Sequence, residues 1–283
     1  MSRKFERTDR RRRPRTVLTE TLVIVGGLVC VLPLLIALLT SFKPESEIIQ
    51  FRSILPQDWT IDNYRQVLTA PEETPIVRWL MNSLFIASSA TLLVLTVTSM
   101  AAYAIARLRP PGSRVMLYVM IATLMIPAQV FLIPVYLILE FMHLIDTPWA
   151  LILPAGSSVF GVFLLHQFFL GIPVDLEEAA EIDGCSPLRI YWHLLLPLSR
   201  PALATLGIFV FVGSWNDFLG PLVFLESTRN LTLPVGIALY QTSYFAEYGL
   251  TLAASMLATL PAVVIFLVFQ KRIIEGVSLT GLK

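Results

Sequence analysis

The feature that most constrains this chain is a series of six apolar runs, each long enough to cross a lipid bilayer as a helix. They occupy residues 22–39, 80–106, 115–139, 149–170, 201–225 and 250–269. The hydrocarbon core offers the backbone no water, so such segments must pair their backbone groups within helices. With 55% hydrophobic and only 14% charged residues, the chain is predicted to be an all-α integral membrane protein with six transmembrane helices.

Prolines lie inside several of these runs, at Pro33, Pro127, Pro134, Pro154, Pro221 and Pro261. A proline removes a backbone hydrogen bond from a helix. It is tolerated in a membrane where neighbouring helices or a water-filled cavity satisfy the freed groups. The pattern therefore predicts kinked helices packed together in a bundle.

The basic residues predict how the chain is oriented. Residues 1–16 carry eight Lys and Arg. If the N-terminus is placed in the cytoplasm, the cytoplasmic segments together hold sixteen Lys and Arg and the external segments hold five. By the positive-inside rule, both termini then face the cytoplasm. The sequence TSFKPESEI after the first run contains no small-residue cleavage site, so we interpret the start as a basic tail rather than a targeting signal.

These segments give a domain division with one large transmembrane unit. We expect a basic cytoplasmic tail (1–21), a first transmembrane helix (22–41), an external loop (42–79), a five-helix transmembrane domain (80–270) with a polar loop at 171–200, and a cytoplasmic C-terminal tail (271–283). The two cysteines fall in a span and in a cytoplasmic loop, so no disulfide is expected. The net charge of +1 makes nucleic acid an unexpected partner.

The sequence lacks the short motifs of common enzymes. It contains no H-E-x-x-H, no G-x-S-x-G and no Cys/His spacing typical of metal ligands, so neither catalytic nor metal-binding residues are predicted. It also contains no G-x-x-x-x-G-K-[ST] phosphate-binding loop. If the protein uses ATP, another subunit must bind it.

Few polar residues fall inside the apolar runs, and Gln129, Asn216 and Asp217 are the ones we expect near a translocation path. Polar side chains are costly in hydrocarbon and usually face a bundle interior or a water-filled route. For Asp217 a local role is equally open, because its side chain could satisfy backbone groups freed by Gly220 and Pro221.

The polar loop contains the stretch DLEEAAEIDGCSPLRIYWHLLLP, residues 175–197, which predicts two short helices and a bend. Asp175 and Glu178 have the spacing of a capping box at the start of the first helix. Gly184 can end that helix in a left-handed conformation. Ser186 and the proline after it predict the start of a second helix.

The first of these helices is predicted to carry a shallow face made of Leu176, Ala179, Ala180 and Asp183, which are spaced three and four apart. A small-residue ridge rimmed by carboxylates would fit a groove on another protein that is lined by basic residues. The same signals would also serve a self-contained cytoplasmic hairpin. The pattern alone leaves both interpretations open.

The loop resembles the EAA loop of ABC-importer permeases. Glu178, Ala179 and Ala180 are followed by Gly184 and by L-x-L-P at residues 194–197, with leucine at 194 where isoleucine is commoner. The resemblance extends to FKPESEI, WLMNS, AAYAIAR, IPVYLI, SWNDFLGPLVFL, TLPVGI and FQKRIIEGVSLTGLK. Together these stretches are similar to the smaller six-span permease subunit of the carbohydrate-uptake, maltose-type group.

The resemblance implies a type I ABC importer permease fold with a cytoplasmic coupling-helix loop, in the cytoplasmic membrane of a prokaryote. It implies a heterodimer with a second permease, a dimer of ABC ATPase subunits, an external solute-binding protein and the lipid bilayer as partners. ATP and Mg would be bound by the partner ATPase, and no cofactor by this chain. The cargo would be a sugar, an oligosaccharide or a related polyol or glycoside.

The resemblance also assigns roles to particular residues. It implies that the ATPase is contacted by Glu178, Ala179, Ala180, Asp183, Gly184, Leu196 and Pro197. It implies that an outer segment with Gly236, Tyr240 and Tyr244 reaches into the binding protein, although an aromatic belt at the membrane interface also explains these tyrosines. An ion-coupled secondary carrier, or a membrane enzyme acting on a lipid-linked substrate, remains the alternative.

Overall fold

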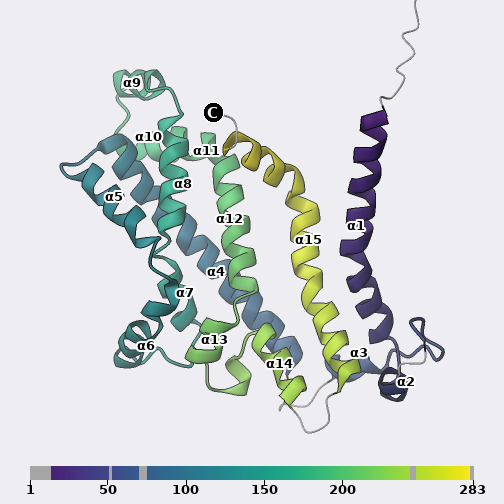
Figure 1. The fold of residues 1–283 in the computed structure, drawn as a ribbon. Helices are drawn as coiled ribbons and strands as arrows, with labels where there is room; N and C mark the ends of the chain where they lie inside the picture. Colours follow the sequence, from purple (N-terminus) through teal and green to yellow (C-terminus); the bar gives the residue numbers. More distant parts are fainter. Residues whose placement is uncertain (1–13, 51–52, 70–74, 243–246, 281–283) are drawn as a thin grey trace, which may run out of the picture.

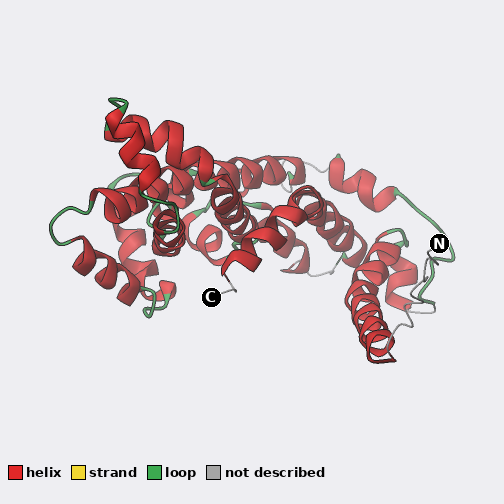
Figure 2. Ribbon diagram, turned by 90° about the horizontal axis from the view of Figure 1, so that it is seen from above, coloured by secondary structure: helices red, strands yellow, loops and turns green. Residues whose placement is uncertain are grey.

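The computed structural model describes residues 14–50, 53–69, 75–242 and 247–280, and every regular element in these ranges is a helix (Figure 2). Long helices run between two ends of the molecule (Figure 1). One end carries α9 (Asp175–Ile182), and we name it the α9 face. The opposite end carries α14 (Leu233–Thr242), and we name it the α14 face.

The first helix, α1 (Pro14–Ser41), begins within the basic tail and lies beside α15 (Tyr248–Thr280) (Figure 1). Its most apolar 18-residue window is not buried by any other part of the described chain. A helix that is apolar all round requires an apolar environment. Its surface is therefore available to lipid or to another membrane helix.

The centre of the bundle is α4 (Ile76–Tyr103), which continues into a π-helix, η1 (Ala104–Leu108). It packs against α8 (Val159–Leu170) and α12 (Arg200–Trp215). Close approach depends on Gly161 in α8, because a Cβ there would lie 2.9 Å from Cγ2 of Thr98. Small residues allow helix backbones to approach in this way in membranes.

The third apolar run is not one straight span, contrary to the expectation for residues 115–139. It forms α5 (Ser113–Thr123), a 3₁₀ turn η2 (Ala128–Phe131) and α6 (Leu132–Phe141), with a bend of 96° between the two parts. Pro127 lies at the bend with an extended backbone. Proline has no N–H and disfavours a helical residue before it, which explains why the helix stops here.

The next two runs are also interrupted. The fourth run forms α7 (Trp149–Ala155) and α8, with Ser158 capping α8 by accepting a hydrogen bond from the Gly161 amide at 3.2 Å. The fifth run ends as a helix at Trp215, and α13 (Leu219–Phe224) follows after a short break. Residues at both breaks, including Ser158 and Asp217, line one cavity.

The described residues contain three helices that are individually long and apolar enough to cross a membrane: Thr19–Ser41, Ile76–Leu108 and Trp149–Leu170. Two bent pairs raise this number to as many as five, namely α5 with α6 and the helical residues Pro187–Leu198 with α12. The last helix, α15, contributes a shorter apolar stretch, Tyr248–Val264. The expected bundle is thus present, with bends that the apolar runs alone do not reveal.

The expected external loop at 42–79 contains two short helices, α2 (Glu45–Gln50) and α3 (Asp62–Leu68), which lie on the α14 face (Figure 1). Glu45 holds this loop against the bundle, since its carboxylate accepts hydrogen bonds from the amides of Tyr248 and Gly249 at 3.1 and 2.8 Å. These amides lie at the start of α15, where a helix favours negative charge.

Two main hydrophobic clusters stabilise the bundle, one toward each face. The cluster near the α9 face joins residues of α4, η1, α8 and α12, including Ala106, Leu165, Phe169 and Leu206. The cluster near the α14 face joins residues of α3, α4, α14 and α15, including Trp79. A cavity lies between the two clusters, beside α4.

Candidate functional site

The polar loop folds as two helical pieces joined at Gly184, as the sequence predicts. Gly184 has a φ of +80°, which residues with a Cβ rarely adopt. Its amide donates to the Glu181 carbonyl and the Cys185 amide donates to the Ala180 carbonyl, both at 2.9 Å. This pair of hydrogen bonds is the Schellman motif, and it ends α9 sharply.

The second piece begins at Ser186, whose hydroxyl accepts a hydrogen bond from the Arg189 amide at 3.4 Å. It comprises α10 (Pro187–Ile190), a π-helix η3 (Tyr191–Leu195) and α11 (Leu196–Leu198). The expected cap by Ser186 is confirmed. The π-helical segment was not expected from the sequence.

The predicted capping box at Asp175 is wrong. Val174 takes the N-cap position with a helical backbone, and its side chain offers no cap. Asp175 is instead the first residue of α9, and Glu177 and Glu178 complete an acidic first turn. These carboxylates still favour the helix, since they lie near the positive end of its dipole.

α9 presents different residues to the bundle and to its surroundings. Ala180 packs against the hydrophobic cluster of the bundle, whereas Ala179 and Glu178 are exposed. The expectation that both alanines face outward is therefore wrong for Ala180. Ile182, which is 87% exposed, and Asp183 also point away from the bundle.

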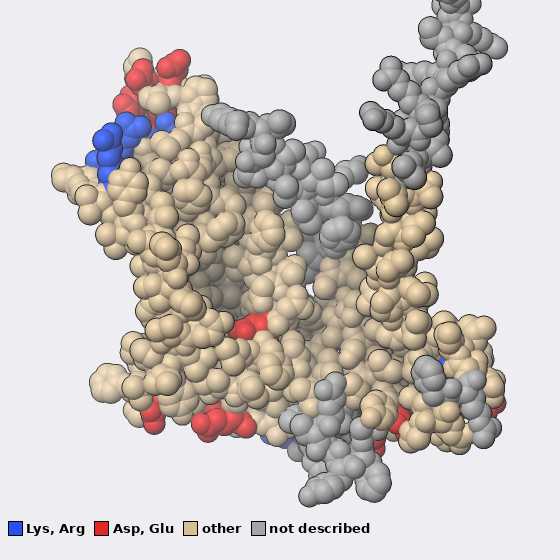
Figure 3. Space-filling view, in the orientation of Figure 1, with Lys and Arg blue, Asp and Glu red and all other residues tan. Residues whose placement is uncertain are grey.

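Acidic side chains gather over α9 at the edge of the α9 face, with basic side chains beside them (Figure 3). Four exposed carboxylates contribute to the acidic surface: Asp175, Glu178, Glu181 and Asp183. The exposed side of α9 thus combines negative charge with one large apolar side chain. Leu196 and Pro197 are only partly exposed, and Leu196 packs against the bundle.

Arg107, at the end of η1, fixes α9 to the bundle. Its Nε lies 2.9 Å from Oε1 of Glu177, and its Nη2 donates to the carbonyls of Phe169 and Ile172 at 2.5 Å. Burial raises the pKa of Glu177 and the adjacent guanidinium of Arg107 lowers it, with burial prevailing. The sequence indicates Arg107 only as a cytoplasmic positive charge, so this contact was not expected.

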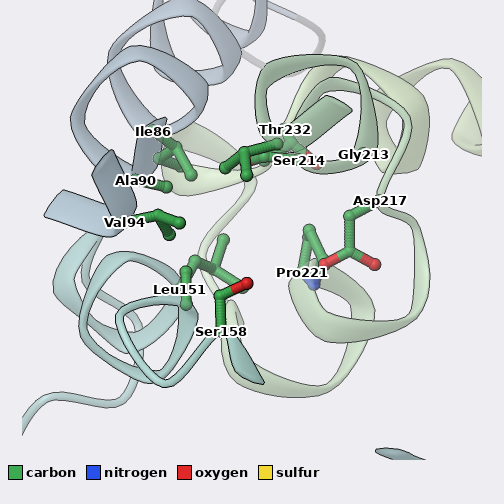
Figure 4. A pocket seen from close by; sticks show the side chains of 12 residues that line it. Ile86, Ala90, Val94, Leu151, Ser158, Gly213, Ser214, Asp217, Pro221 and Thr232 are labelled. Carbon is green, nitrogen blue, oxygen red and sulfur yellow. The ribbon is translucent and has the colours of Figure 1, made fainter. Parts of the chain in front are cut away.

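A cavity of about 270 Å³ lies inside the bundle between α4, α12 and the two helix breaks (Figure 4). Apolar residues of α4 line one side of it. Its polar lining consists of Ser158, Ser214, Asp217 and Thr232. The hydroxyl of Thr232 is buried and has no hydrogen-bond partner among the described residues. The cavity therefore offers hydroxyl groups and one carboxylate to whatever enters it.

Of the three residues expected near a path, only Asp217 lines this cavity. Its Oδ1 accepts a hydrogen bond from the Gly220 amide at 3.3 Å, so the expected local role is also present. Gln129 is exposed in η2, and Asn216 is exposed at the end of α12. Ser214 and Thr232 were missed, because nothing in the sequence distinguishes them from other hydroxyl residues in apolar segments.

The outer segment expected to meet a binding protein is described only in part. Gly236 lies in α14 and is buried against Trp79 of α4, so it does not form an outer surface itself. Tyr240 belongs to the same helix by its backbone. Tyr244 lies outside the described residues. Among the residues described, no group of three or more His, Cys, Asp or Glu could hold a metal ion.

Comparison with known proteins gives consistent matches over most of the chain. The sequence model of the family "Binding-protein-dependent transport system inner membrane component" matches residues 95–278. The arabinooligosaccharides transport system permease protein AraQ of Halalkalibacterium halodurans is 35% identical, over 90% of this chain and 92% of the relative. The diacetylchitobiose uptake system permease protein NgcG of Streptomyces coelicolor is 34% identical, over 92% and 87%.

A solved structure shares the fold. In the crystal structure of a bacterial ABC transporter involved in the import of the acidic polysaccharide alginate, one chain superposes with a TM-score of 0.80 and 22% identity. The match covers 95% of this chain and 99% of that chain. The bent helices and the polar loop are therefore part of a known membrane architecture.

Proposed function

Because this chain belongs to the family of binding-protein-dependent transport system inner membrane components, in which it is a permease subunit and not an enzyme, we propose that α9 couples it to an ATPase. The observation that carries this proposal is the exposed surface of α9. Glu178, Ala179 and Asp183 point away from the bundle on a helix that Gly184 ends sharply. A short, rigid, acidic helix of this kind fits a cleft lined by basic side chains.

The proposed assembly contains a second permease, a dimer of ABC ATPases and an external solute-binding protein. The unburied apolar surface of α1 supports contact with another membrane-embedded chain. ATP and Mg²⁺ belong to the ATPase subunits in this proposal. The α9 face lies in the cytoplasm, and the α14 face meets the binding protein. The loop-by-loop excess of Lys and Arg supports this orientation.

The proposed mechanism is mechanical. Closure of the ATPase pair around ATP displaces its cleft, α9 moves with the cleft, and the bundle changes from inward-open to outward-open. Such coupling requires that each permease conformation binds one nucleotide state better than the other. Gly184 contributes by adopting the left-handed conformation that the two hydrogen bonds of the Schellman motif require, and these bonds hold the bend so that displacement of the cleft is not absorbed there.

The proposed cargo is a sugar, an oligosaccharide or a related polyol or glycoside. Two relatives are named for arabinooligosaccharide and diacetylchitobiose transport. The cavity adds physical support, since Ser158, Ser214 and Asp217 offer both donors and acceptors to a polyhydroxylated molecule. A carboxylate beside hydroxyl groups is a common way to bind sugar hydroxyls by charge-assisted hydrogen bonds.

The coupling role can be tested by cross-linking in the assembled transporter. In a background with Cys30→Ser and Cys185→Ser, Asp183→Cys should form disulfides with cysteines placed in the ATPase cleft. Ser53→Cys, on the opposite face, should not. In intact cells an impermeant thiol reagent should modify Ser53→Cys and spare Ser186→Cys. Modification of Ser186→Cys from outside would contradict the orientation, and absence of any cross-link at residue 183 would contradict the coupling role.

The contribution of the bend can be measured separately. Gly184→Asn keeps a side chain that tolerates the left-handed region, whereas Gly184→Val introduces a branched one. We expect Gly184→Val to reduce co-purification of the ATPase and uptake, and Gly184→Asn to retain most of both. Equal behaviour of the two variants would argue against a role for the bend.

A further inference from the structure

Three polar residues on one helix contact the polar loop, at intervals of four residues. We name Ser99, Tyr103 and Arg107 the polar stripe of α4 and η1. Ser99 Oγ lies 2.8 Å from the hydroxyl of Tyr191, and the hydroxyl of Tyr103 donates to the Pro187 carbonyl at 2.9 Å. The third member, Arg107, makes the contacts with Glu177 and the end of α8 described above.

The polar stripe is buried. Ser99 and Tyr103 are 1% and 7% exposed, and the side chain of Arg107 is 5% exposed. Tyr191, its partner in the loop, is 2% exposed and packs its ring 5.3 Å from that of Tyr103. A buried polar group that loses its hydrogen-bond partner cannot pair with water instead. It is left unpaired, which costs free energy, so these contacts resist separation.

The contacts of the stripe involve both π-helical segments of this region. η1 contains Arg107, and η3 begins at Tyr191. A π-helix is less favourable than an α-helix and occurs mostly at functional sites. Here η1 directs Arg107 toward the polar loop, and η3 directs Tyr191 toward α4. The less favourable backbone of these two π-helical segments therefore occurs where α4 and η1 contact the polar loop.

The same helix also borders the cavity. Ile86, Ala90 and Val94 of α4 line its wall, one to four turns before the polar stripe. A displacement of α9 that is passed to α4 would therefore reach the cavity without any other intermediary.

We propose that the polar stripe fixes the coupling loop to α4, so that the two move as one body, and that Arg107 is the main positioning residue for coupling. This inference rests on the proposed function of α9. Arg107 carries the largest part because, of the three stripe residues, it is the one whose side chain contacts α8, α9 and the segment between them. Ser99 and Tyr103 hold the second piece of the loop in the same way.

The test measures how the cavity responds to nucleotide. In right-side-out vesicles containing the full transporter, with Cys30→Ser and Cys185→Ser, Ser214→Cys reports the cavity through its labelling rate with an impermeant thiol reagent. Vesicles are loaded either with no nucleotide or with ATP, Mg²⁺ and orthovanadate. With Arg107 present, the trapped state should label at a different rate from the nucleotide-free state. Arg107→Gln should reduce this difference by about fivefold or more, the low end of typical coupling between sites.

Arg109→Gln is the matched control, because Arg109 is exposed two residues away, its Nε donates to the Ala106 carbonyl, and its charge acts on Glu177 more weakly than that of Arg107. It should keep the full nucleotide response. ATP hydrolysis and co-purification of the ATPase are measured on every variant. A folded Arg107→Gln complex that responds to nucleotide as the control does would overturn the proposal.

Two milder variants answer the question if Arg107→Gln does not fold. Glu177→Gln leaves the hydrogen bonds from Arg107 to Phe169 and Ile172 in place, and Tyr103→Phe removes a single hydroxyl. Each should reduce the nucleotide response below that of the Arg109→Gln control, and Arg107→Lys, which keeps the positive charge, should retain part of the response. Unchanged responses in both milder variants would also overturn the proposal. Failure of the proposed function is recognised separately, since residue 183 would then not cross-link to the ATPase even with Arg107 present.

Discussion

The indole ring of Trp79 in α4 lies directly against Gly236 in α14. A methyl group at residue 236 would lie 2.1 Å from the ring carbon Cε3. Trp79 is fully buried, and its Nε1 donates to the Thr228 carbonyl at 2.6 Å. The ring cannot move aside without losing this hydrogen bond, so the absence of a side chain at residue 236 is what lets α14 pack on α4.

Gly236→Ala should therefore destabilise the α14 face. We expect a loss of about 1–3 kcal/mol, the usual cost of overpacking a filled site. Thermal unfolding of the purified transporter measures this effect. Gly27→Ala in α1 is the matched control, because nothing lies within 4 Å of a Cβ at that position. An unchanged unfolding temperature for Gly236→Ala would show that the contact is not maintained in the membrane.

The two alanines of α9 should respond differently to enlargement. Ala180 packs on the bundle, so Ala180→Phe should lower the stability of the permease itself, by about 1–3 kcal/mol. Ala179 is exposed, so Ala179→Phe should leave the permease stable and weaken its association with the ATPase. Thermal unfolding and co-purification separate the two effects. The reverse pattern would mean that α9 is rotated in the assembled transporter.

The local conformation of the polar loop could be predicted from the sequence because short-range rules determine it. Gly184 ends α9 and Ser186 caps the next piece, as their residue types and spacing indicate. The rotation of α9 could not be predicted in this way. It depends on Arg107, which lies 70 residues before Glu177 in the sequence, and periodicity within one helix does not reveal which side a distant residue will contact.

The apolar runs predicted a helical membrane bundle, but not its bends. Length and hydropathy at residues 115–139 are those of one span. In the structure the helix is interrupted at Pro127, and its two parts lie at an angle of 96° to each other. The same limit applies to the cavity. All three of Gln129, Asn216 and Asp217 are candidates from the sequence, and only the path of the chain through the helix break at residues 216–218 brings Asp217 to the cavity wall.

Asp146 should make the α14 face sensitive to acid. It lies between α6 and α7, and its carboxylate accepts hydrogen bonds from the amides of Glu226 and Ser227 at 3.0 and 2.9 Å and from the Ser227 hydroxyl. Burial alone would raise the pKa of Asp146, but these hydrogen bonds outweigh it and the pKa is lowered. A carboxyl with a lowered pKa stabilises the fold above its unfolded value, near 3.8, and this contribution is lost as the pH falls through the folded pKa.

The measurement is thermal unfolding of the native protein and of Asp146→Asn between pH 7 and pH 3. At neutral pH the variant should be less stable by about 1 kcal/mol, a typical value for a lost hydrogen bond. The difference should stay constant down to about pH 4 and shrink below it. A difference that grows on acidification would contradict the lowered pKa.

Asp217 provides the most direct test of the cavity, because it combines two roles that one substitution can separate. Its Oδ1 accepts a hydrogen bond from the Gly220 amide, and its carboxylate lies in the cavity wall. Asn can keep the first interaction through its carbonyl oxygen while removing the charge.

If the cavity binds cargo, Asp217→Asn should reduce uptake about tenfold or more, since hydrogen bonds to charged groups contribute about 1.5–3 kcal/mol. Asn216→Ala, at an exposed neighbour outside the cavity, should transport normally. Normal uptake by Asp217→Asn would remove Asp217 from the path, and loss of the folded protein instead of uptake would show that its local role at the helix break is the one that matters.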